Sequence, residues 1–250
     1  MTEDPLEDLI ALTRDLGRPD RDLVVLAEGN TSIRTGRGRM LVKASGSRMA
    51  RAAAADFVEV DTAGLLGLLD QDEAADDLPE AMLAARTAGE GRPSIEALLH
   101  ALCIEHAGAS VVGHTHPVAA NALLCSDRAH LLVEGALFPD QVVVLGRHAL
   151  LVPYADPGLD IAREVDRGLR GHLERHGTPP RLIYLANHGI FALGSSTAEV
   201  DAITEMAVKL ARVMSGVLAA GEPAYLPPES VAALDGRPDE TRRRARLATR

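Results

Sequence analysis

Apolar residues recur at helical spacing in several parts of the chain, and these periods predict its main helices. In the helix that runs to Gly108, Ser94 is expected to be the N-cap, because its hydroxyl can accept a bond from the first turn. Gly177 is expected to end a later helix, since glycine readily adopts the left-handed conformation of a C-terminus. The predicted helices cover residues 5–16, 94–108, 159–176 and 197–221.

Shorter runs, rich in β-branched residues, predict strands. Gly36 and Gly38 supply a turn that would join the first two runs as a hairpin. Pro117 is expected to stop a central strand, and an Asn-His-Gly kink separates the last two strands. The predicted strands lie within residues 24–35, 40–46, 56–61, 109–117, 141–146, 148–158 and 181–194.

The order of these elements predicts an α/β fold. Helices and strands do not alternate strictly, and hairpin-like pairs favour a central, mostly antiparallel sheet covered by helices. We expect one domain over residues 1–234, followed by a basic C-terminal tail at 235–250 that is a solvated helix or a frayed terminus.

Composition narrows the classes of partner. The formal net charge of −10 argues against nucleic acid, whose binding surfaces are usually basic. No apolar run is long enough to span a membrane, and the acidic N-terminus does not resemble a signal peptide. The two cysteines, Cys103 and Cys125, form no CxxC motif, which fits a reducing compartment. We therefore expect a cytoplasmic protein with no nucleic-acid or membrane partner.

The strongest chemical signal is the motif His114-Thr115-His116. Side chains alternate along a strand, so two histidines at positions i and i+2 can reach one metal ion from the same face. A catalytic zinc site uses three protein ligands and keeps a position open. The alternative is a pair of packed or hydrogen-bonded histidines near the end of a strand.

His188 is the best candidate for a third ligand. It follows an apolar strand at the kink, and Gly189 permits close approach of the backbone. It could equally be a turn histidine that caps the strand. The histidines at 130, 148, 172 and 176 lie in polar stretches and are expected to be exposed.

Glu96 lies near the start of an apolar helix, where a buried carboxylate beside a metal could act as a general acid or base. It could also do no more than interact with the helix dipole. His100 follows at i+4 and could hydrogen-bond to it.

Two polar loops, residues 29–32 and 43–47, offer amides, hydroxyls and an ammonium group, which suit a phosphate or a carboxylate. Neither is a Walker or a Rossmann loop, and either could be an ordinary polar turn.

Six motifs, taken in order, resemble the class II aldolase/adducin family, which includes fuculose-phosphate and rhamnulose-phosphate aldolases. The resemblance spans roughly residues 9–220. The motifs are AEGNTS, VKASG, RPSIEALLH, GHTHP, LVPYADPG and ANHGIFALG.

The resemblance implies a single α/β/α domain, assembled as a homotetramer with sites at subunit interfaces. It implies His114, His116 and His188 as ligands of a divalent metal, most readily Zn²⁺, with Mn²⁺, Co²⁺ or Fe²⁺ also open. It implies Glu96 as the acid/base group. The substrate-binding positions correspond to Asn30, Ser45, Gly46 and Ser94, with the Lys43 ammonium group beside them.

Two positions depart from the family pattern. Ile95 stands where the fuculose-phosphate aldolases have a second serine, which removes one hydroxyl from the phosphate site. Residues 133–143 contain no tyrosine. The fuculose-phosphate aldolases have a tyrosine in this stretch, and it reaches the site of a neighbouring subunit. The phosphorylation of the substrate therefore stays open.

The implied function is a lyase that cleaves a C–C bond of a small hydroxy-keto sugar or sugar phosphate. It would act in a retro-aldol reaction, through a metal-stabilised enediolate. A decarboxylase, dehydratase or epimerase of the same family is the alternative, since loss of carbon dioxide gives the same enediolate. The family's epimerases carry Asp at the position of Glu96, which favours cleavage here. A non-catalytic, adducin-like interaction protein is a further alternative, and it would be expected to lose the metal histidines.

Overall fold

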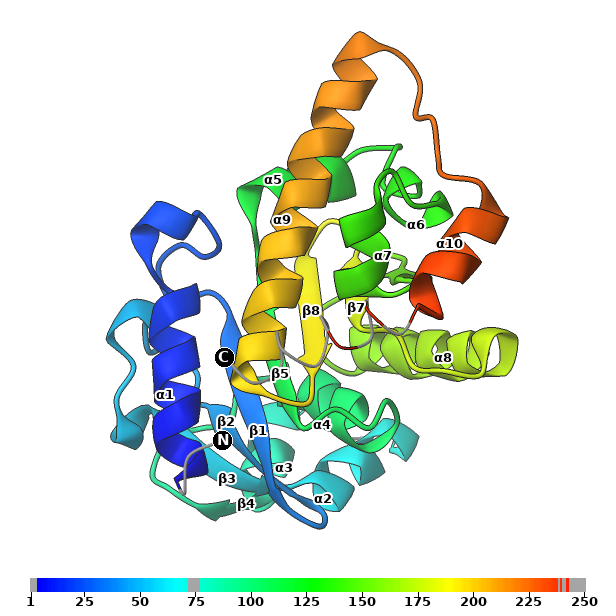
Figure 1. Ribbon diagram of the computed structural model, residues 1–250. Coiled ribbons are helices and arrows are strands. Elements are labelled where there is room, and N and C mark those ends of the chain that lie inside the picture. Colours follow the sequence, from blue (N-terminus) through cyan, green and yellow to red (C-terminus); the bar gives the residue numbers. More distant parts are fainter. Residues whose placement is uncertain (1–3, 72–76, 238, 240–241, 243–250) are drawn as a thin grey trace.

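The computed structural model describes residues 4–71, 77–237, 239 and 242, and in them one eight-stranded sheet forms the centre of the protein (Figure 1). The strand order is β4-β3-β2-β1-β5-β8-β7-β6. All neighbouring strands are antiparallel except β6 and β7, which are parallel. The strands are β1 (Asn30–Gly36), β2 (Arg39–Lys43), β3 (Phe57–Asp61), β4 (Arg86–Ala88), β5 (Val111–Thr115), β6 (Leu150–Val152), β7 (Leu182–Leu185) and β8 (Gly189–Gly194).

Helices cover both faces of the sheet, which gives three layers and confirms the predicted α/β/α fold. One face packs against α1, α5, α6, α7 and α9, and the other against α2, α3, α4 and α8. Helix α9 lies over the central strands, and its C-terminal part extends past them (Figure 1). The helices are α1 (Pro5–Leu16), α2 (Thr62–Leu66), α3 (Leu78–Ala84), α4 (Ala97–Glu105), α5 (Val118–Leu124), α6 (Leu131–Glu134), α7 (Pro139–Leu145), α8 (Leu159–His176), α9 (Thr197–Ala220) and α10 (Pro228–Asp235).

Alternation along the central strands divides the core between the two faces. In β5, Val111 packs with the α1 and α9 side, and Val112 with the α4 side. In β8, Ile190 belongs to the first cluster and Phe191 to the second. Both residues of each pair are buried, because helices cover both faces and these strands are hydrophobic throughout.

Three of the predicted helices are confirmed almost to the residue. Asp4 caps α1 by accepting a 2.9 Å bond from the backbone of Leu6. Helix α8 ends where Gly177 adopts φ +68°. Helix α9 begins after Ser196, whose hydroxyl accepts from the backbone N–H of Glu199.

The predicted cap at Ser94 is wrong. Helix α4 begins at Ala97, and Glu96 itself occupies the N-cap position with helical φ and ψ of −76° and −5°. The Ser94 hydroxyl instead accepts a 3.3 Å bond from the backbone N–H of Glu96. The turn that precedes the helix therefore places the Glu96 carboxylate at the helix start rather than on its side.

The strand predicted at residues 141–146 is also wrong, because these residues belong to helix α7. Pro139 opens the helix, and Gln141–Leu145 are all buried. A short, fully buried helix shows neither alternation nor an exposed face, so its apolar run resembles that of a buried strand. Helix α7 contacts α9 and α10 in place of a sheet neighbour.

The basic tail that was predicted at residues 235–250 lies mostly outside the described residues. The domain limit at residue 234 stays a prediction. None of the described helices combines the length and the apolar character that crossing a bilayer requires.

Candidate metal centre

The centre of the sheet brings the histidine motif beside the first polar loop. Strand β5 lies between β1 and β8, and its His114 is paired with Asn30 of β1 on one side and with Phe191 of β8 on the other. Both pairings are antiparallel, so their register fixes which side chains adjoin His114. Residues far apart in the sequence thus meet at the end of β5.

His114 is fully buried, and its ring stacks on that of Phe191 with a centroid distance of 4.2 Å. Its Nδ1 lies 2.9 Å from the carbonyl oxygen of Ile190, so Nδ1 carries the proton that this bond needs. The other ring nitrogen, Nε2, points toward the other histidines. A backbone acceptor that fixes the tautomer in this way is typical of metal-binding histidines.

His116 directly follows β5, and its Nε2 lies 2.9 Å from Nε2 of His114. Burial, and then the imidazoles of His114 and His188, lower the pKa of His116 to about 3. This ring is therefore neutral at pH 7. Its backbone N–H donates a 2.8 Å bond to the carbonyl of Leu23, which ties the segment after β5 to the loop before β1.

His188 lies in the turn between β7 and β8, where Asn187 has a φ of +57°. Asn121 of α5 holds this turn, because its amide donates a 2.9 Å bond to the carbonyl of His188. Gly189 lets the turn approach β5 closely: a Cβ there would lie 2.5 Å from the carbonyl oxygen of Thr115 and 2.8 Å from Cδ2 of His116.

The Glu96 carboxylate faces two of these imidazoles. Its Oε1 lies 3.1 Å from Nε2 of His114 and 3.0 Å from Nε2 of His188. Burial by itself raises the pKa of Glu96, but the facing imidazoles outweigh burial and hold this pKa well below its usual value. The carboxylate is therefore ionised at neutral pH.

A chain of hydrogen bonds orients Glu96. The Asn30 amide donates to Oε2 of Glu96 at 2.6 Å and to the Ser94 hydroxyl at 3.3 Å. The Asn30 carbonyl oxygen contacts Nε2 of His100, whose Nδ1 lies 2.7 Å from the Ser32 hydroxyl. His100 is fully buried, and burial lowers its pKa to about 3. The neutral ring thus donates to Asn30 and accepts from Ser32.

The expected bond between His100 and Glu96 is therefore replaced by an indirect link through Asn30. The sequence reasoning also missed two other contacts. Glu28 has its Oε2 3.7 Å from Nδ1 of His116, and Asn121 holds the His188 turn. Glu28 lies within the AEGNTS motif, which was the one available signal. Asn121 had none, because only packing brings α5 to this turn.

The second polar loop lies beside the Ser94 segment. The backbone N–H of Ser45 donates a 3.0 Å bond to the carbonyl of Arg92, and Ala44 forms an isolated bridge with Pro93. Ser45 and Gly46 are exposed. Lys43 is 2% exposed, and its Nζ donates to the carbonyl of Ala44 at 3.2 Å. Burial lowers the Lys43 pKa against the opposing effects of Asp56 and Glu96.

The four central side chains form a group that fits a metal ion. One ligand atom from each of Glu96, His114, His116 and His188 lies within 4.8 Å of the others, and the described residues contain no second group with this property. Nε2 of His114 faces both a carboxylate oxygen and another imidazole nitrogen. Such a convergence of acceptors requires a cation, either a further proton or a metal ion. Three imidazoles are a donor set suited to Zn²⁺ and similar ions.

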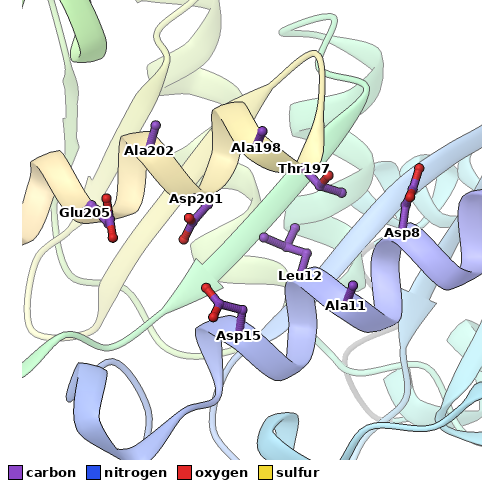
Figure 2. A pocket seen from close by; sticks show the side chains of 9 residues that line it. All are labelled: Asp8, Ala11, Leu12, Asp15, Thr197, Ala198, Asp201, Ala202 and Glu205. Atoms are coloured by element: carbon purple, nitrogen blue, oxygen red, sulfur yellow. The ribbon is translucent and has the colours of Figure 1, made fainter. Parts of the chain in front are cut away.

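A groove between α1 and α9 is a different kind of site (Figure 2). Its volume is about 440 Å³, and its walls carry Asp8, Asp15, Asp201 and Glu205. Arg21 pairs with two of these carboxylates, with Nη1 2.6 Å from the Asp201 carboxylate and in contact with Asp15. The groove contains none of the predicted site residues and no imidazole, so the histidine group stays the candidate centre.

Comparison with protein families gives one match, to the Class II Aldolase and Adducin N-terminal domain, over residues 7–215. This match covers most of the chain and includes all four residues of the histidine and glutamate group. No curated protein matches the chain by sequence.

Solved structures share the fold. An L-fuculose 1-phosphate aldolase is 21% identical with a TM-score of 0.72, and the alignment covers 94% of this chain and 96% of that one. YgbL of Klebsiella pneumoniae is described as an aldolase/epimerase/decarboxylase. It is 22% identical to this chain, with a TM-score of 0.70. That alignment covers 92% of this chain and 96% of YgbL. A class II aldolase domain of a Thermoplasma acidophilum protein is 24% identical, with a TM-score of 0.65 and coverage of 86% and 95%.

Proposed function

Because the chain belongs to the class II aldolase and adducin family, we propose that it is a metal-dependent lyase acting on a small hydroxy-keto compound. The proposed reaction is retro-aldol cleavage of a C–C bond in a sugar or sugar phosphate. The observation that carries this proposal is the position of Glu96, whose carboxylate lies within 3.1 Å of two of the three converging imidazoles. An acid/base group thus adjoins the place where a metal would be held.

His114, His116 and His188 would hold the metal, for which we propose Zn²⁺, with Mn²⁺, Co²⁺ or Fe²⁺ as the other possibilities. When bound, a divalent ion supplies Lewis acidity, which stabilises negative charge on the substrate oxygens as the C–C bond breaks. The chain's own contribution is to orient the imidazoles. The Ile190 carbonyl accepts from Nδ1 of His114 and leaves Nε2 facing the site, and burial keeps His116 neutral.

Glu96 would move the proton. It rests as a carboxylate, so in the synthetic direction it can accept a proton from the nucleophilic carbon of the substrate. In the cleavage direction Glu96 would take up the proton that the substrate hydroxyl loses as the C–C bond breaks, and would pass it to the carbon. Asn30 holds Oε2 of this carboxylate throughout, so Oε1 remains turned toward the reacting end of the substrate.

The opposite end of the substrate would lie near the two polar loops. Ser94 and Asn30 offer a hydroxyl and an amide beside Glu96, and the exposed turn at Ser45 and Gly46 adjoins the same segment. Lys43 places a positive charge beneath that turn. These groups suit a phosphate or a carboxylate, which is the group that we propose they bind.

Decarboxylation of a β-keto acid is the second candidate, and Ile95 favours it. This side chain is 36% exposed next to Glu96, where a hydroxyl would serve a phosphate better. A dehydratase or an epimerase would use the same residues. An adducin-like binding role explains neither the converging imidazoles nor the hydrogen bonds that orient Glu96.

The test combines metal analysis with an activity screen. Elemental analysis of the tag-free protein, with separate His116→Ala and Glu96→Gln variants, should give bound metal in the wild type and in Glu96→Gln and a loss in His116→Ala. Aldehyde release from hydroxy-keto sugars and their phosphates would then be compared with carbon dioxide release from β-keto acids. Only the wild type should turn over. A metal-free wild type, or full activity of Glu96→Gln, would refute the mechanism.

We also propose a homotetramer in the cytoplasm. Val25, Leu26 and Val118 are 55%, 70% and 53% exposed, and they lie on the segments that flank His116. A subunit interface beside the centre would cover them. Light scattering during gel filtration should give four times the chain mass, and a monomeric mass with full activity would contradict this assembly.

A further inference from the structure

A second group of histidines lies outside the candidate metal centre, between helix α8 and the segment that leads into β6. His172 and His176 are one turn apart at i and i+4, so they share one face of the last two turns of α8. His148 comes from the segment before β6. Close packing brings these parts together, because a Cβ at Gly168 of α8 would lie 3.3 Å from the side chain of Leu150.

The three rings are in direct contact. His148 stacks on His176 with a centroid distance of 3.9 Å and an interplanar angle of 15°, and His172 lies 4.6 Å from His176. His172 is 6% exposed, contrary to the expectation from sequence, whereas His148 is exposed as expected. Within the part of the chain that the structure describes, no hydrogen bond uses any of the six ring nitrogens. None of these nitrogens is among the buried polar atoms that lack a partner, so they are open to solvent and available to a ligand.

The rings are neutral at pH 7, which leaves each one with a lone pair. Burial, the neighbouring histidines and Arg175 lower the pKa of His172 to about 4, and the pKa values of His148 and His176 are lowered as well. Four arginines line the two cavities beside the rings. Arg147, Arg167 and Arg175 are exposed to solvent, which screens their charges, and Arg181 is paired with Glu199. Asp235 of α10 lines the same cavity as Arg147, and its negative charge opposes the lowering of the His148 pKa.

There is room for an ion on either side of the rings. A cavity of about 510 Å³ is lined by all three histidines and by the bare helix positions Gly168 and Gly171. A second cavity of about 290 Å³ is lined by the same three histidines and by Asp235. Both can admit the ion together with the water molecules that complete its coordination.

The geometry points to a second divalent transition-metal site, in which His148, His172 and His176 bind a zinc-class ion such as Zn²⁺, Ni²⁺ or Cu²⁺. The i, i+4 pair on α8 supplies two imidazoles, and His148, which is exposed, rotates out of its stack to supply the third. This group is looser than the first centre, since its nitrogens do not all fall within 4.8 Å of one another. Imidazole nitrogens prefer these ions to Mg²⁺ or Ca²⁺. A bound ion would link α8 to the start of β6.

The test separates this site from the proposed catalytic one. Tag-free protein is stripped with a chelator and dialysed against a low Zn²⁺ concentration, and bound zinc per chain is then measured. The wild type should hold two ions, and His116→Ala and His176→Ala one each. The double variant should hold none. His130→Ala, which removes an exposed histidine elsewhere, should behave as the wild type.

Thermal unfolding in the His116→Ala background gives a readout that does not depend on activity. Zn²⁺ should raise the Tm of this variant, and the added changes His148→Ala or His176→Ala should abolish the rise. If His176→Ala binds as much zinc as its parent in both backgrounds, the second site does not exist. Stabilisation by inorganic phosphate and not by Zn²⁺ would likewise overturn the proposal, and would assign the cavity to an anion.

Discussion

The side-chain amide of Asn30 donates a hydrogen bond of 2.6 Å to Oε2 of Glu96. Asn30 begins β1 and Glu96 precedes α4, so this bond joins the sheet to the helix that carries the proposed acid/base group. His100 holds the other end of the same amide, and Ser32 holds His100. The direction in which Glu96 points is thus determined by the sheet rather than by the helix.

Asn30→Ala should lower kcat by about 10- to 100-fold. It removes a hydrogen bond to a charged group, worth about 1.5–3 kcal/mol. Bound metal should stay at the wild-type level, because Asn30 is not one of the four clustered groups. Steady-state kinetics with the substrate found in the screen, together with metal analysis, checks both parts. A variant with unchanged kcat would show that Glu96 needs no such support.

His100→Leu should lower the free energy of unfolding by about 1–3 kcal/mol, because it leaves the buried groups of Asn30 and Ser32 without their partner. It should also lower kcat, since the Asn30 amide becomes free to rotate. Cys103→Ala is the matched control, because Cys103 is a buried position in the same helix and is not one of the site residues. Denaturant curves should give a lower free energy of unfolding for both variants, whereas kcat should fall only in His100→Leu.

Gly189→Ala should cause loss of metal binding and lower stability. The added Cβ would lie 2.5 Å from the Thr115 carbonyl and 2.8 Å from the His116 ring, so the His188 turn must move away from β5. Gly216→Ala in α9 meets nothing within 4 Å and should instead stabilise the protein by about 0.5–1 kcal/mol. Calorimetry and zinc titration of the two variants test this contrast. Equal zinc affinity in both would contradict it.

His172 should make the protein labile to acid. Its folded pKa of about 4 lies below the unfolded value of 6.5, so the unfolded chain takes up the proton first as the pH falls. The stabilisation is complete above pH 6.5 and is lost progressively toward pH 4. Between pH 7 and pH 5 the free energy of unfolding should fall in the wild type. In His172→Gln this fall should be smaller by up to about 2 kcal/mol. Chelator in the buffer removes metal effects from these denaturant curves.

His130→Gln controls for that comparison, because His130 is exposed. It should follow the wild-type pH dependence. If His172→Gln follows it too, burial of His172 has no energetic consequence.

The central sheet and the histidine group could be predicted from the sequence because both rest on local patterns. Alternation placed His114 and His116 together, and the glycine after His188 marked a close approach. The six ordered motifs added Glu96. These signals depend on neighbours in the sequence, which a single chain displays directly.

The sequence predictions fail where tertiary packing, rather than the local sequence pattern, determines the structure. Residues 141–145 are buried on every side, and a run of that length carries no period that separates a helix from a strand. His172 stands among charged residues, yet its face of α8 packs against β6. Asn121 and Glu28 reach the centre from other elements, and no spacing rule connects them to it.

The pairing of Asn30 with His114 also has a kinetic consequence. The centre draws on β1, α4, β5 and the turn between β7 and β8, which are distant in the chain, so almost every ligand contact closes a long loop. Such contacts form slowly and only after the strands have found their register. We therefore expect the metal-binding geometry to arise late in folding, so that an ion binding there would select chains whose central sheet is already complete.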